Sequence, residues 1–332
     1  MSKVYIIAEA GVNHNGDLKK AKKLIQEAKK AGADAVKFQY YKTENLVLKK
    51  TPKTKYQKKN EKKFKNQFDM LKKYELSKYH LVLLQRIAQK LKIDFFVSVF
   101  NHENFKEIKK LNFPFIKIPS GEINNVPLLK YIGKANKKTI LSTGMSQMKE
   151  VKKAVNLLEK NGLKRNKLTV LHCNSAYPTP IDNVNLNAIT SIKNELKLRV
   201  GYSDHTETEL TSLAAVSLGA KVIEKHLTLD KKLEGPDHKS SFNSNEFKKL
   251  VDKIRLTEKI LGSGLKFVSS SEAENKKYVR KSIVAKKSIR KGEIFTEKNL
   301  TLLRPAGGKS PYLWDKLIGT KSRRNYNEFE KI

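Results

Sequence analysis

The chain has 332 residues, 39% of them hydrophobic, so it can bury the core of one large domain or of a large and a small one. Its single cysteine, Cys173, excludes an intrachain disulfide and is typical of a reducing compartment. No apolar run approaches the roughly 18 residues of a membrane span, and the N-terminus lacks the apolar core of a signal peptide. We therefore expect a cytoplasmic protein with no membrane partner.

The net charge of +36 suggests an anionic partner, and a basic nucleic-acid-binding protein is one hypothesis. Only nine of the 69 basic residues are arginine, however. Recognition of bases and phosphates favours the planar guanidinium, and no RNA-recognition, zinc-finger or helix-turn-helix signature is present. We expect a lysine-rich surface that attracts a small anionic substrate, and no nucleic-acid partner.

Strand-like and helix-like segments alternate along most of the chain. Helices are expected at 18–31, 78–91 and 207–220, among others, and a lysine-rich segment of low periodicity lies at about 41–74. The expected strands are 4–8, 35–39, 94–99, 115–120, 139–144, 168–173, 199–204 and 221–227. Eight strands with crossover helices predict an α/β fold, a (β/α)₈ TIM barrel of roughly 250 residues. A doubly wound open sheet is the alternative, but the first turn lacks its glycine-rich fingerprint.

Almost every expected strand begins apolar and ends polar. Barrel enzymes build their active sites at the carboxyl ends of the strands, so this pattern predicts an enzyme. Two of these strand ends carry His205 and His226. Parallel neighbouring strands would bring the two imidazoles together, where they can bind a divalent metal and leave positions open for substrate and water. Mn²⁺ suits such a site best, with Mg²⁺ or Co²⁺ as alternatives.

Lys37 and Lys117 lie inside expected strands, where lysine is seldom needed for packing. We expect both to bind an anionic substrate, with hydroxyl groups of Ser120 and Ser142 as further donors.

Three carboxyl groups are candidates for acid–base work or for binding a substrate hydroxyl. They are Glu9 at the end of the first strand, Glu122 after the fourth, and Asp237 in the loop after the eighth.

After residue 267 the composition of the sequence changes: a polar run is followed by a segment in which apolar residues alternate with turn residues. We expect a barrel at 1–267, a polar linker at 268–277 and a second, mostly β domain at 278–332. A domain of about 55 residues is near the lower size limit for burying a core of its own, so we expect it to pack against another surface.

A series of motifs resembles the bacterial sialic acid synthase family, phosphoenolpyruvate-condensing enzymes that make N-acetylneuraminate and related nonulosonates. The resemblance covers nearly the whole chain. The matching motifs are AEAGVNHNG at 8–16, AVKFQ at 35–39, KIPSGE at 117–122, LSTGM at 141–145, LHC at 171–173, YPTP at 177–180, GYSDHT at 201–206, EKH at 224–226 and GPDH at 235–238.

The resemblance implies a barrel followed by a small antifreeze-protein-like domain, and a homodimer in which that domain reaches over the partner's barrel. It implies that His205 and His226 bind the metal, and that Arg304 enters the partner's active site. Phosphoenolpyruvate would be bound by Lys37, Lys117, Ser142 and Ser203, and the aldehyde sugar by Glu9, Gln39, Tyr177 and Asp237.

The implied reaction is a metal-dependent condensation of phosphoenolpyruvate with an N-acylated hexosamine, releasing phosphate by C–O cleavage. With N-acetylmannosamine as the sugar, the enzyme is an N-acetylneuraminate synthase, our first hypothesis. The alternative is a legionaminate-type synthase that uses a 2,4-diacetamido-trideoxy hexose. Departures at Val99 and Ala306 bear on sugar choice and on the small domain rather than on the reaction class.

Overall fold

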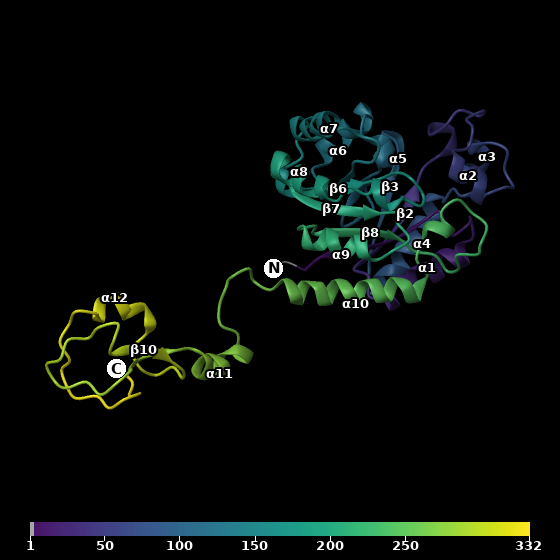
Figure 1. The fold of residues 1–332 in the computed structure, drawn as a ribbon. Helices are drawn as coiled ribbons and strands as arrows, with labels where there is room; N and C mark the ends of the chain where they lie inside the picture. The colour runs from purple at the N-terminus through teal and green to yellow at the C-terminus, as the bar shows by residue number, and fades with distance from the viewer. Residues whose placement is uncertain (1–2) are drawn as a thin grey trace. The chain divides into compact units, whose positions relative to one another are not determined.

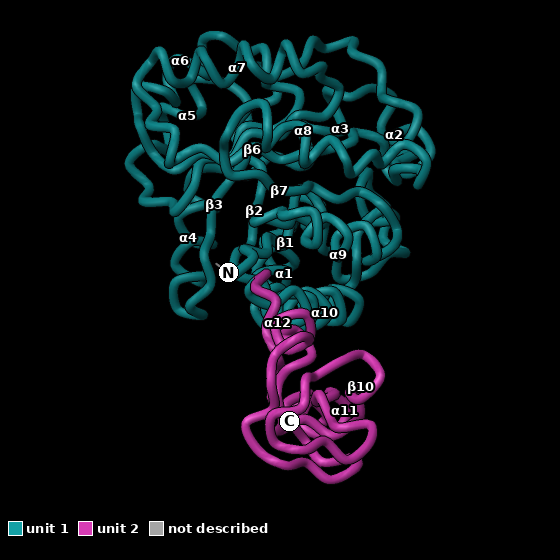
Figure 2. Tube along the Cα trace, turned by 60° about the vertical axis from the view of Figure 1, so that its left-hand side comes forward, with its two compact units in different colours: residues 1–263 teal, residues 264–332 magenta. Residues whose placement is uncertain are grey.

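Eight parallel strands close into a barrel in the order β1 to β8, which confirms the predicted fold class. The computed structural model describes residues 3–332. Helices surround the strands in the larger of two compact units, residues 1–263 and 264–332 (Figures 1 and 2). The strands are β1 (Tyr5–Gly11), β2 (Ala35–Tyr40), β3 (Asp94–Val99), β4 (Ile116–Ile118), β5 (Thr139–Ser142), β6 (Leu168–Cys173), β7 (Arg199–Asp204) and β8 (Val222–His226).

Amphipathic helices cover the outside of the barrel. Helix α1 shows why they form: the Asp17 side chain accepts hydrogen bonds from the N–H groups of Lys19 and Lys20, and apolar residues bury one face. The α-helices of this unit are α1 (Leu18–Lys30), α2 (Lys55–Asn60), α3 (Gln67–Lys73), α4 (Lys78–Lys90), α5 (His102–Ile108), α6 (Val126–Ala135), α7 (Met148–Lys160), α8 (Asn187–Leu196), α9 (Leu210–Ser217) and α10 (Ser244–Leu261). Its 3₁₀ turns are η1 (Thr43–Asn45), η2 (Ser120–Glu122), η3 (Arg165–Lys167), η4 (Ile181–Asn183) and η5 (His238–Ser240). Among the helices of residues 3–332, none is both long and apolar enough to cross a membrane.

Strand register determines which side chains meet inside the barrel. Glu9 on β1 pairs with Lys37 on β2 and with His226 on β8, so the first and last strands close the ring at that level. Asp204 on β7 pairs with Lys225 on β8. His205 follows Asp204 directly and His226 follows Lys225, so the two imidazoles come from the same level of the barrel.

The segment between β2 and α4 is longer than the other connections. It holds η1, α2 and α3 and packs a small apolar cluster of its own, in which Val12, Tyr41, Met70 and Tyr74 are buried. The hydrophobic residues of this segment show little periodicity in the sequence, and the structure shows short helices separated by turns.

The second unit has a small core in which seven hydrophobic residues are buried, among them Ile283, Phe295 and Leu300. Strands β9 (Ser282–Ala285) and β10 (Leu300–Leu303) pair antiparallel, and the unit also contains η6 (Pro311–Leu313) and α12 (Trp314–Leu317). The segment 268–277, interpreted as a linker from its sequence, contains most of helix α11 (Ser270–Val279).

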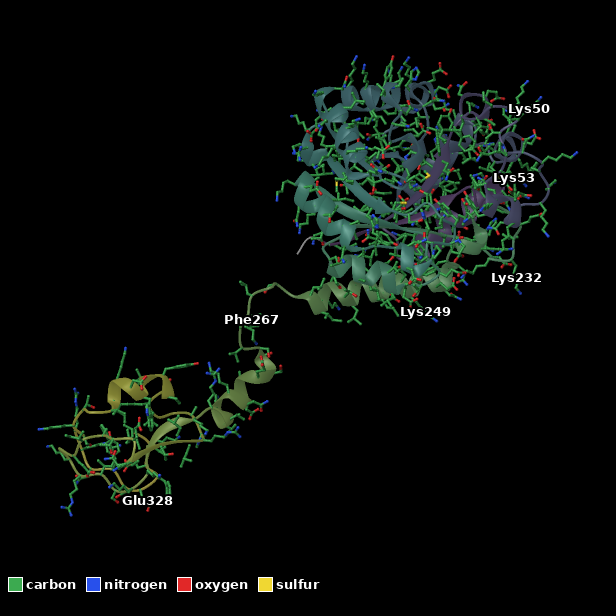
Figure 3. The ribbon with its side chains drawn as sticks, turned by 45° about the horizontal axis from the view of Figure 1, so that its top comes forward. Lys50, Lys53, Lys232, Lys249, Phe267 and Glu328 are labelled. Atoms are coloured by element: carbon green, nitrogen blue, oxygen red, sulfur yellow. The ribbon has the colours of Figure 1, made fainter. Side chains whose placement is uncertain are left out.

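Lysine side chains extend from much of the surface. Lys50, Lys232 and Lys249, labelled in Figure 3, are exposed and come from separate parts of the barrel unit.

Candidate active site

A cavity of about 280 Å³ lies at the carboxyl ends of the strands. It gathers residues that are far apart in sequence, because parallel strands end at the same mouth of a barrel. Ten of the thirteen predicted site residues line it: Glu9, Lys37, Gln39, Lys117, Ser120, Ser142, Tyr177, Ser203, His205 and His226.

Two ammonium groups share one carboxylate at the centre of the cavity. Lys117 Nζ lies 2.9 Å from Glu224 Oε1 and 3.1 Å from Oε2, and Lys37 Nζ lies 3.6 Å from the same Oε1. Lys37 Nζ also lies 2.8 Å from Glu9 Oε2 and donates to Ser98 Oγ at 2.9 Å. The lysines and both carboxylates are almost fully buried.

This arrangement keeps Glu224 ionised. Burial raises the pKa of its carboxyl, but the neighbouring charges of Lys117 and Lys37 outweigh burial and hold the pKa at about 2. Burial lowers the pKa of Lys117, and the charge of Lys37 adds to that effect while Glu224 opposes it. An incoming anion can therefore share the two ammonium groups with Glu224.

Glu9 and Asp237 are two buried carboxyl groups of the site, and the charge of Glu9 acts on Asp237. Burial raises the pKa of Asp237 to about 7, and the charge of Glu9 adds to the effect. Burial also raises the pKa of Glu9, although Lys37 opposes it. A carboxyl group whose pKa lies near neutral pH, as that of Asp237 does, can both donate and accept a proton, which is what a general acid–base group needs.

His205 and His226 lie side by side, with ring centroids 5.3 Å apart and planes at 63°. His226 Nδ1 is buried and has no hydrogen-bond partner among the described residues. His205 Nε2 lies 3.5 Å from Ser203 Oγ, and its Nδ1 lies 2.6 Å from the Asn174 carbonyl oxygen.

Two neighbouring imidazoles, one with an unsatisfied nitrogen, fit a divalent cation whose other ligands are water and substrate oxygen. Within residues 3–332, no group of three or more His, Cys, Asp or Glu side chains is arranged to hold a metal ion. The protein's own contribution to such a site is therefore the histidine pair.

Ser120, at the start of η2 after β4, and Ser142, at the end of β5, provide hydroxyl groups. The Gly144 N–H donates to Ser120 Oγ at 3.0 Å, whereas Ser142 Oγ is buried without a partner in the described part of the chain. A Cβ on Gly144 would come within 2.2 Å of Ser175 Oγ, so only glycine fits between these hydroxyl groups. Ser142 Oγ lines the same cavity as Lys37 and Lys117 and is available to donate to an anionic substrate.

Three predicted residues lie outside the cavity lining. Glu122 in η2 accepts a hydrogen bond from Asn125 Nδ2 at 2.6 Å instead of facing the cavity. Asp237 is buried in the loop after β8, where burial and then the charge of Glu9 raise the pKa of the Asp237 carboxyl. Arg304 is exposed at the end of β10 in the second unit.

Sequence reasoning missed several residues that line the cavity. Glu224 belongs to a quoted motif, as the third residue of β8, but its ion-pair partners lie on β2 and β4, which are not neighbours of β8 in the barrel. Ser98 could have been found as the polar end of β3. Tyr56, Gln57 and Gln67 come from the segment between β2 and α4, whose sequence shows no pattern that points to the barrel mouth.

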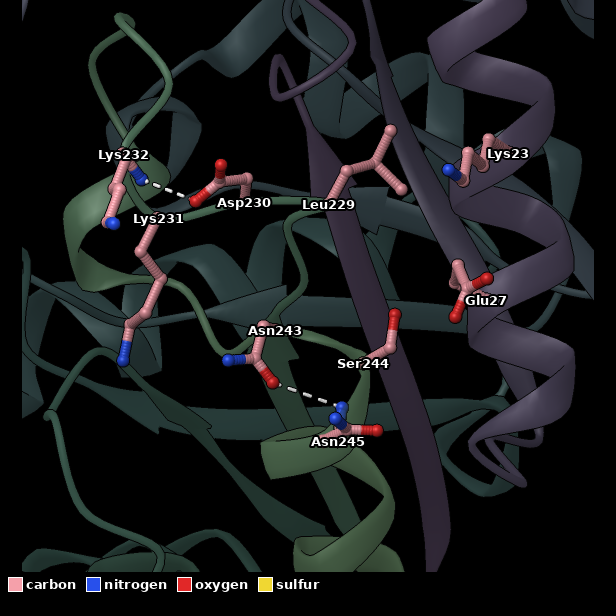
Figure 4. Close-up of a pocket in the computed structure, with 9 residues that line it drawn as sticks. All are labelled: Lys23, Glu27, Leu229, Asp230, Lys231, Lys232, Asn243, Ser244 and Asn245. Carbon is pink, nitrogen blue, oxygen red and sulfur yellow. Dashed lines mark hydrogen bonds between the residues drawn. The ribbon is translucent and has the colours of Figure 1, made fainter.

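A larger cavity, of about 490 Å³, lies beside α1 and the N-terminal end of α10 (Figure 4). Its lysines, such as Lys23 and Lys232, are exposed. The Asn243 side chain already accepts from the N–H groups of Asn245 and Glu246 at the helix start. The cavity holds no group of buried charges comparable to that of the barrel mouth, which makes the barrel mouth the better candidate.

Buried lysines, carboxylates and imidazoles at the mouth of a closed barrel define a (β/α)₈-barrel enzyme with an anion-binding active site. Residues 24–266 match the NeuB family and residues 280–328 match the SAF domain. The chain belongs to the NeuB family, and it is a phosphoenolpyruvate-condensing nonulosonate synthase, a transferase.

Individual relatives support this assignment along the whole chain. An N,N'-diacetyllegionaminic acid synthase of Campylobacter jejuni is 50% identical over 100% of this chain and 99% of its own. The N-acetylneuraminate-9-phosphate synthase of Homo sapiens is 36% identical over 90% of this chain and 82% of its own. The crystal structure of an N-acetylneuraminic acid synthetase from Leptospira borgpetersenii matches with a TM-score of 0.73 and 35% identity, over 82% of this chain and 90% of that one.

Proposed function

We propose that this enzyme condenses phosphoenolpyruvate with a 2,4-diacetamido-trideoxy hexose to give a legionaminate-type nonulosonate. The observation that carries the choice of sugar is the 50% identity, end to end, with the Campylobacter N,N'-diacetyllegionaminic acid synthase. The N-acetylneuraminate-forming relatives are 35–36% identical and match less of the chain. This favours the alternative of the sequence analysis over its first hypothesis, N-acetylneuraminate synthesis, which becomes the second candidate.

Lys37 and Lys117 bind the phosphate and carboxylate groups of phosphoenolpyruvate in this proposal, with Ser120, Ser142 and Ser203 as hydroxyl donors. Their nearly complete burial and the ion pairs with Glu224 fix both ammonium groups before substrate arrives. Positioning and charge stabilisation by such fixed groups are the largest contributions that a protein makes to a condensation of this kind.

In the reaction, C3 of phosphoenolpyruvate attacks the aldehyde carbon of the open-chain sugar and forms the new C–C bond. C2 gains cationic character, water adds there, and the tetrahedral species loses phosphate by cleavage of the C–O bond. Asp237, whose pKa burial raises to about 7, can deliver a proton to the aldehyde oxygen or accept one from the attacking water. Glu9, in an ion pair with Lys37, is the other candidate for this proton transfer. Gln39 and Tyr177 line the cavity together with Glu9, and in this proposal they contact the sugar.

A divalent ion, Mn²⁺ above Mg²⁺ or Co²⁺, would supply Lewis-acid polarisation of the aldehyde when bound by His205 and His226. The buried, unsatisfied His226 Nδ1 supports this assignment.

The proposed assembly is a domain-swapped homodimer, in which Arg304 contacts the sugar bound to the partner. Its support is the exposure of Arg304 at the end of β10 and the small core of the second unit. We place the enzyme in the cytoplasm, where phosphoenolpyruvate is made.

The decisive experiment measures phosphate release from phosphoenolpyruvate with each sugar and each metal. We expect kcat/KM for the 2,4-diacetamido-trideoxy hexose to exceed that for N-acetylmannosamine by at least about 10-fold. The reverse preference would overturn the proposed sugar and restore N-acetylneuraminate synthesis.

A further inference from the structure

One wall of the cavity comes from α2 and the start of α3 rather than from a strand. Asn60 Nδ2 donates to the Pro236 carbonyl oxygen at 3.0 Å, which ties α2 to the loop that carries Asp237. Tyr74 OH donates to Glu61 Oε2 at 2.5 Å, which ties the segment after α2 to the end of α3. These bonds hold the wall in place over the barrel mouth.

Tyr56 of α2 is the outer member of a column of rings. It stacks on Tyr177, with centroids 5.0 Å apart and planes at 29°. Tyr177 in turn stacks on His205, with centroids 4.1 Å apart and planes at 28°. The column starts at the imidazole pair and ends two rings further out, so Tyr56 lies toward the far end of any substrate whose reacting carbon is at His205.

Two carboxamides stand next to Tyr56 in the cavity wall. Gln57 is buried, and its Oε1 accepts from Gln67 Nε2 at 3.2 Å and from the Thr54 N–H at 3.0 Å, while its Nε2 donates to Tyr56 OH at 3.5 Å. The acceptor that this pair offers a substrate is therefore Gln67 Oε1. A carboxamide offers both an N–H donor and a carbonyl acceptor, and an acylamino group needs one of each. The wall therefore combines an aromatic ring with amide groups complementary to an acylamino substituent.

The charged groups that handle phosphoenolpyruvate in this proposal come from other elements than this wall. Lys37 and Lys117 are on β2 and β4, and their ion pairs involve Glu9 and Glu224, not residues of α2 or α3. A sugar with its aldehyde at the imidazole pair extends away from these charges along the ring column. The two candidate sugars differ at that far end: the diacetamido sugar has an acylamino group at C4 and a methyl at C6, whereas N-acetylmannosamine has a hydroxyl and a hydroxymethyl group.

We propose that Tyr56, with Gln57 and Gln67, is the element that selects the sugar, by recognising the C4-acylamino and C6-methyl end. The inference rests on the proposed function and deepens it. The ring packs against the apolar methyl groups, and the carboxamides bond the C4 acylamino group. N-acetylmannosamine offers neither feature at these positions.

The test compares kcat/KM for both sugars in the wild type, Tyr56→Ala, Tyr56→Phe and Gln67→Leu. We expect Tyr56→Ala and Gln67→Leu to lower kcat/KM for the diacetamido sugar by about 10- to 100-fold and to lower that for N-acetylmannosamine much less. Tyr56→Phe keeps the ring and should stay within about 3-fold of the wild type for both sugars. KM for phosphoenolpyruvate should not change in any of the three.

Tyr79→Ala is the matched control, since Tyr79 on α4 is 73% exposed. It should leave the ratio of the two kcat/KM values unchanged. Equal losses on both sugars in Tyr56→Ala and Gln67→Leu, or no loss in either, would overturn the inference. The wild-type preference tests the proposed function separately, because it does not depend on any variant.

Discussion

The floor and the wall of the cavity are built in different ways. The floor comes from strands: Lys37, Lys117 and Glu224 are nearly fully buried and held by ion pairs. The wall comes from the β2–α4 segment, where Tyr56 and Gln67 are half-buried and held by a ring stack and by hydrogen bonds with Gln57 rather than by ion pairs. Strand register fixes the charges needed for the common reaction, while a connection between strands can vary without disturbing them.

The largest expected effect is on the floor. Lys117→Met removes the ammonium group closest to Glu224 and leaves that carboxylate buried with Lys37 as its remaining ion-pair partner. We expect kcat/KM for phosphoenolpyruvate to fall by about 10³-fold or more, measured by phosphate release. Lys249→Met on exposed α10 is the control and should stay within about 2-fold. A fall of less than about 10-fold in Lys117→Met would show that the floor does not bind the anion.

The next effect concerns the support behind the histidine pair. Lys225 Nζ lies 3.1 Å from Asp204 Oδ2, and both side chains are fully buried. Lys225→Met leaves Asp204 without its cation, and we expect the free energy of unfolding to fall by about 3–5 kcal/mol. Urea unfolding measures this change.

Lys248→Met is the matched control for Lys225→Met. Its ion pair with Asp252, at 2.9 Å, is more than half exposed on α10. It should therefore cost less than about 0.5 kcal/mol. Equal costs in the two variants would refute the stabilising role of the buried pair.

The smallest effect lies in the loops around the mouth. Burial lowers the pKa of His14 to about 4 and that of His238 to about 4, below the ordinary value near 6.5. The unfolded chain therefore binds protons as pH falls through 6.5, while the folded chain does not until pH nears 4. The contribution of these two neutral histidines to the free energy of unfolding is fully present above pH 6.5 and is lost as the pH falls from 6.5 to 4.

For each of these histidines we expect a loss of about 2 kcal/mol in the free energy of unfolding between pH 7 and pH 5. His14→Asn should remove its share of the pH dependence in urea unfolding. An unchanged slope in that variant would contradict the neutral, buried state of His14.

The barrel and most of its floor could be predicted from the sequence. Each strand is a short apolar run with polar residues at one end, so the carboxyl-end polar groups, including Lys37 and His226, indicate both the fold and the mouth. β3, β6 and β7 have the predicted bounds, and α1 and α4 end one residue earlier than predicted.

The partners of the site residues and the wall of the cavity could not be predicted, because they depend on contacts between elements that are distant in the sequence. Glu224 on β8 meets Lys117 on β4, four strands away, and no local pattern encodes that pairing. Glu122 was expected in the site, but η2 turns it toward Asn125. Tyr56 reaches the mouth only because α2 folds back over the barrel, and the sequence of that segment lacks the periodicity of a long helix.

The position of Glu224 on the last strand has a consequence during synthesis. A nascent chain that has emerged as far as β7 already contains both lysines but lacks the carboxylate that neutralises them together, and β1 has no neighbour on one edge. Ring closure by β8 therefore supplies the counter-charge and the second imidazole in one event. A chain that ends before this strand would have two lysines without Glu224 and an open sheet edge, and an unpaired edge exposes such a product to aggregation.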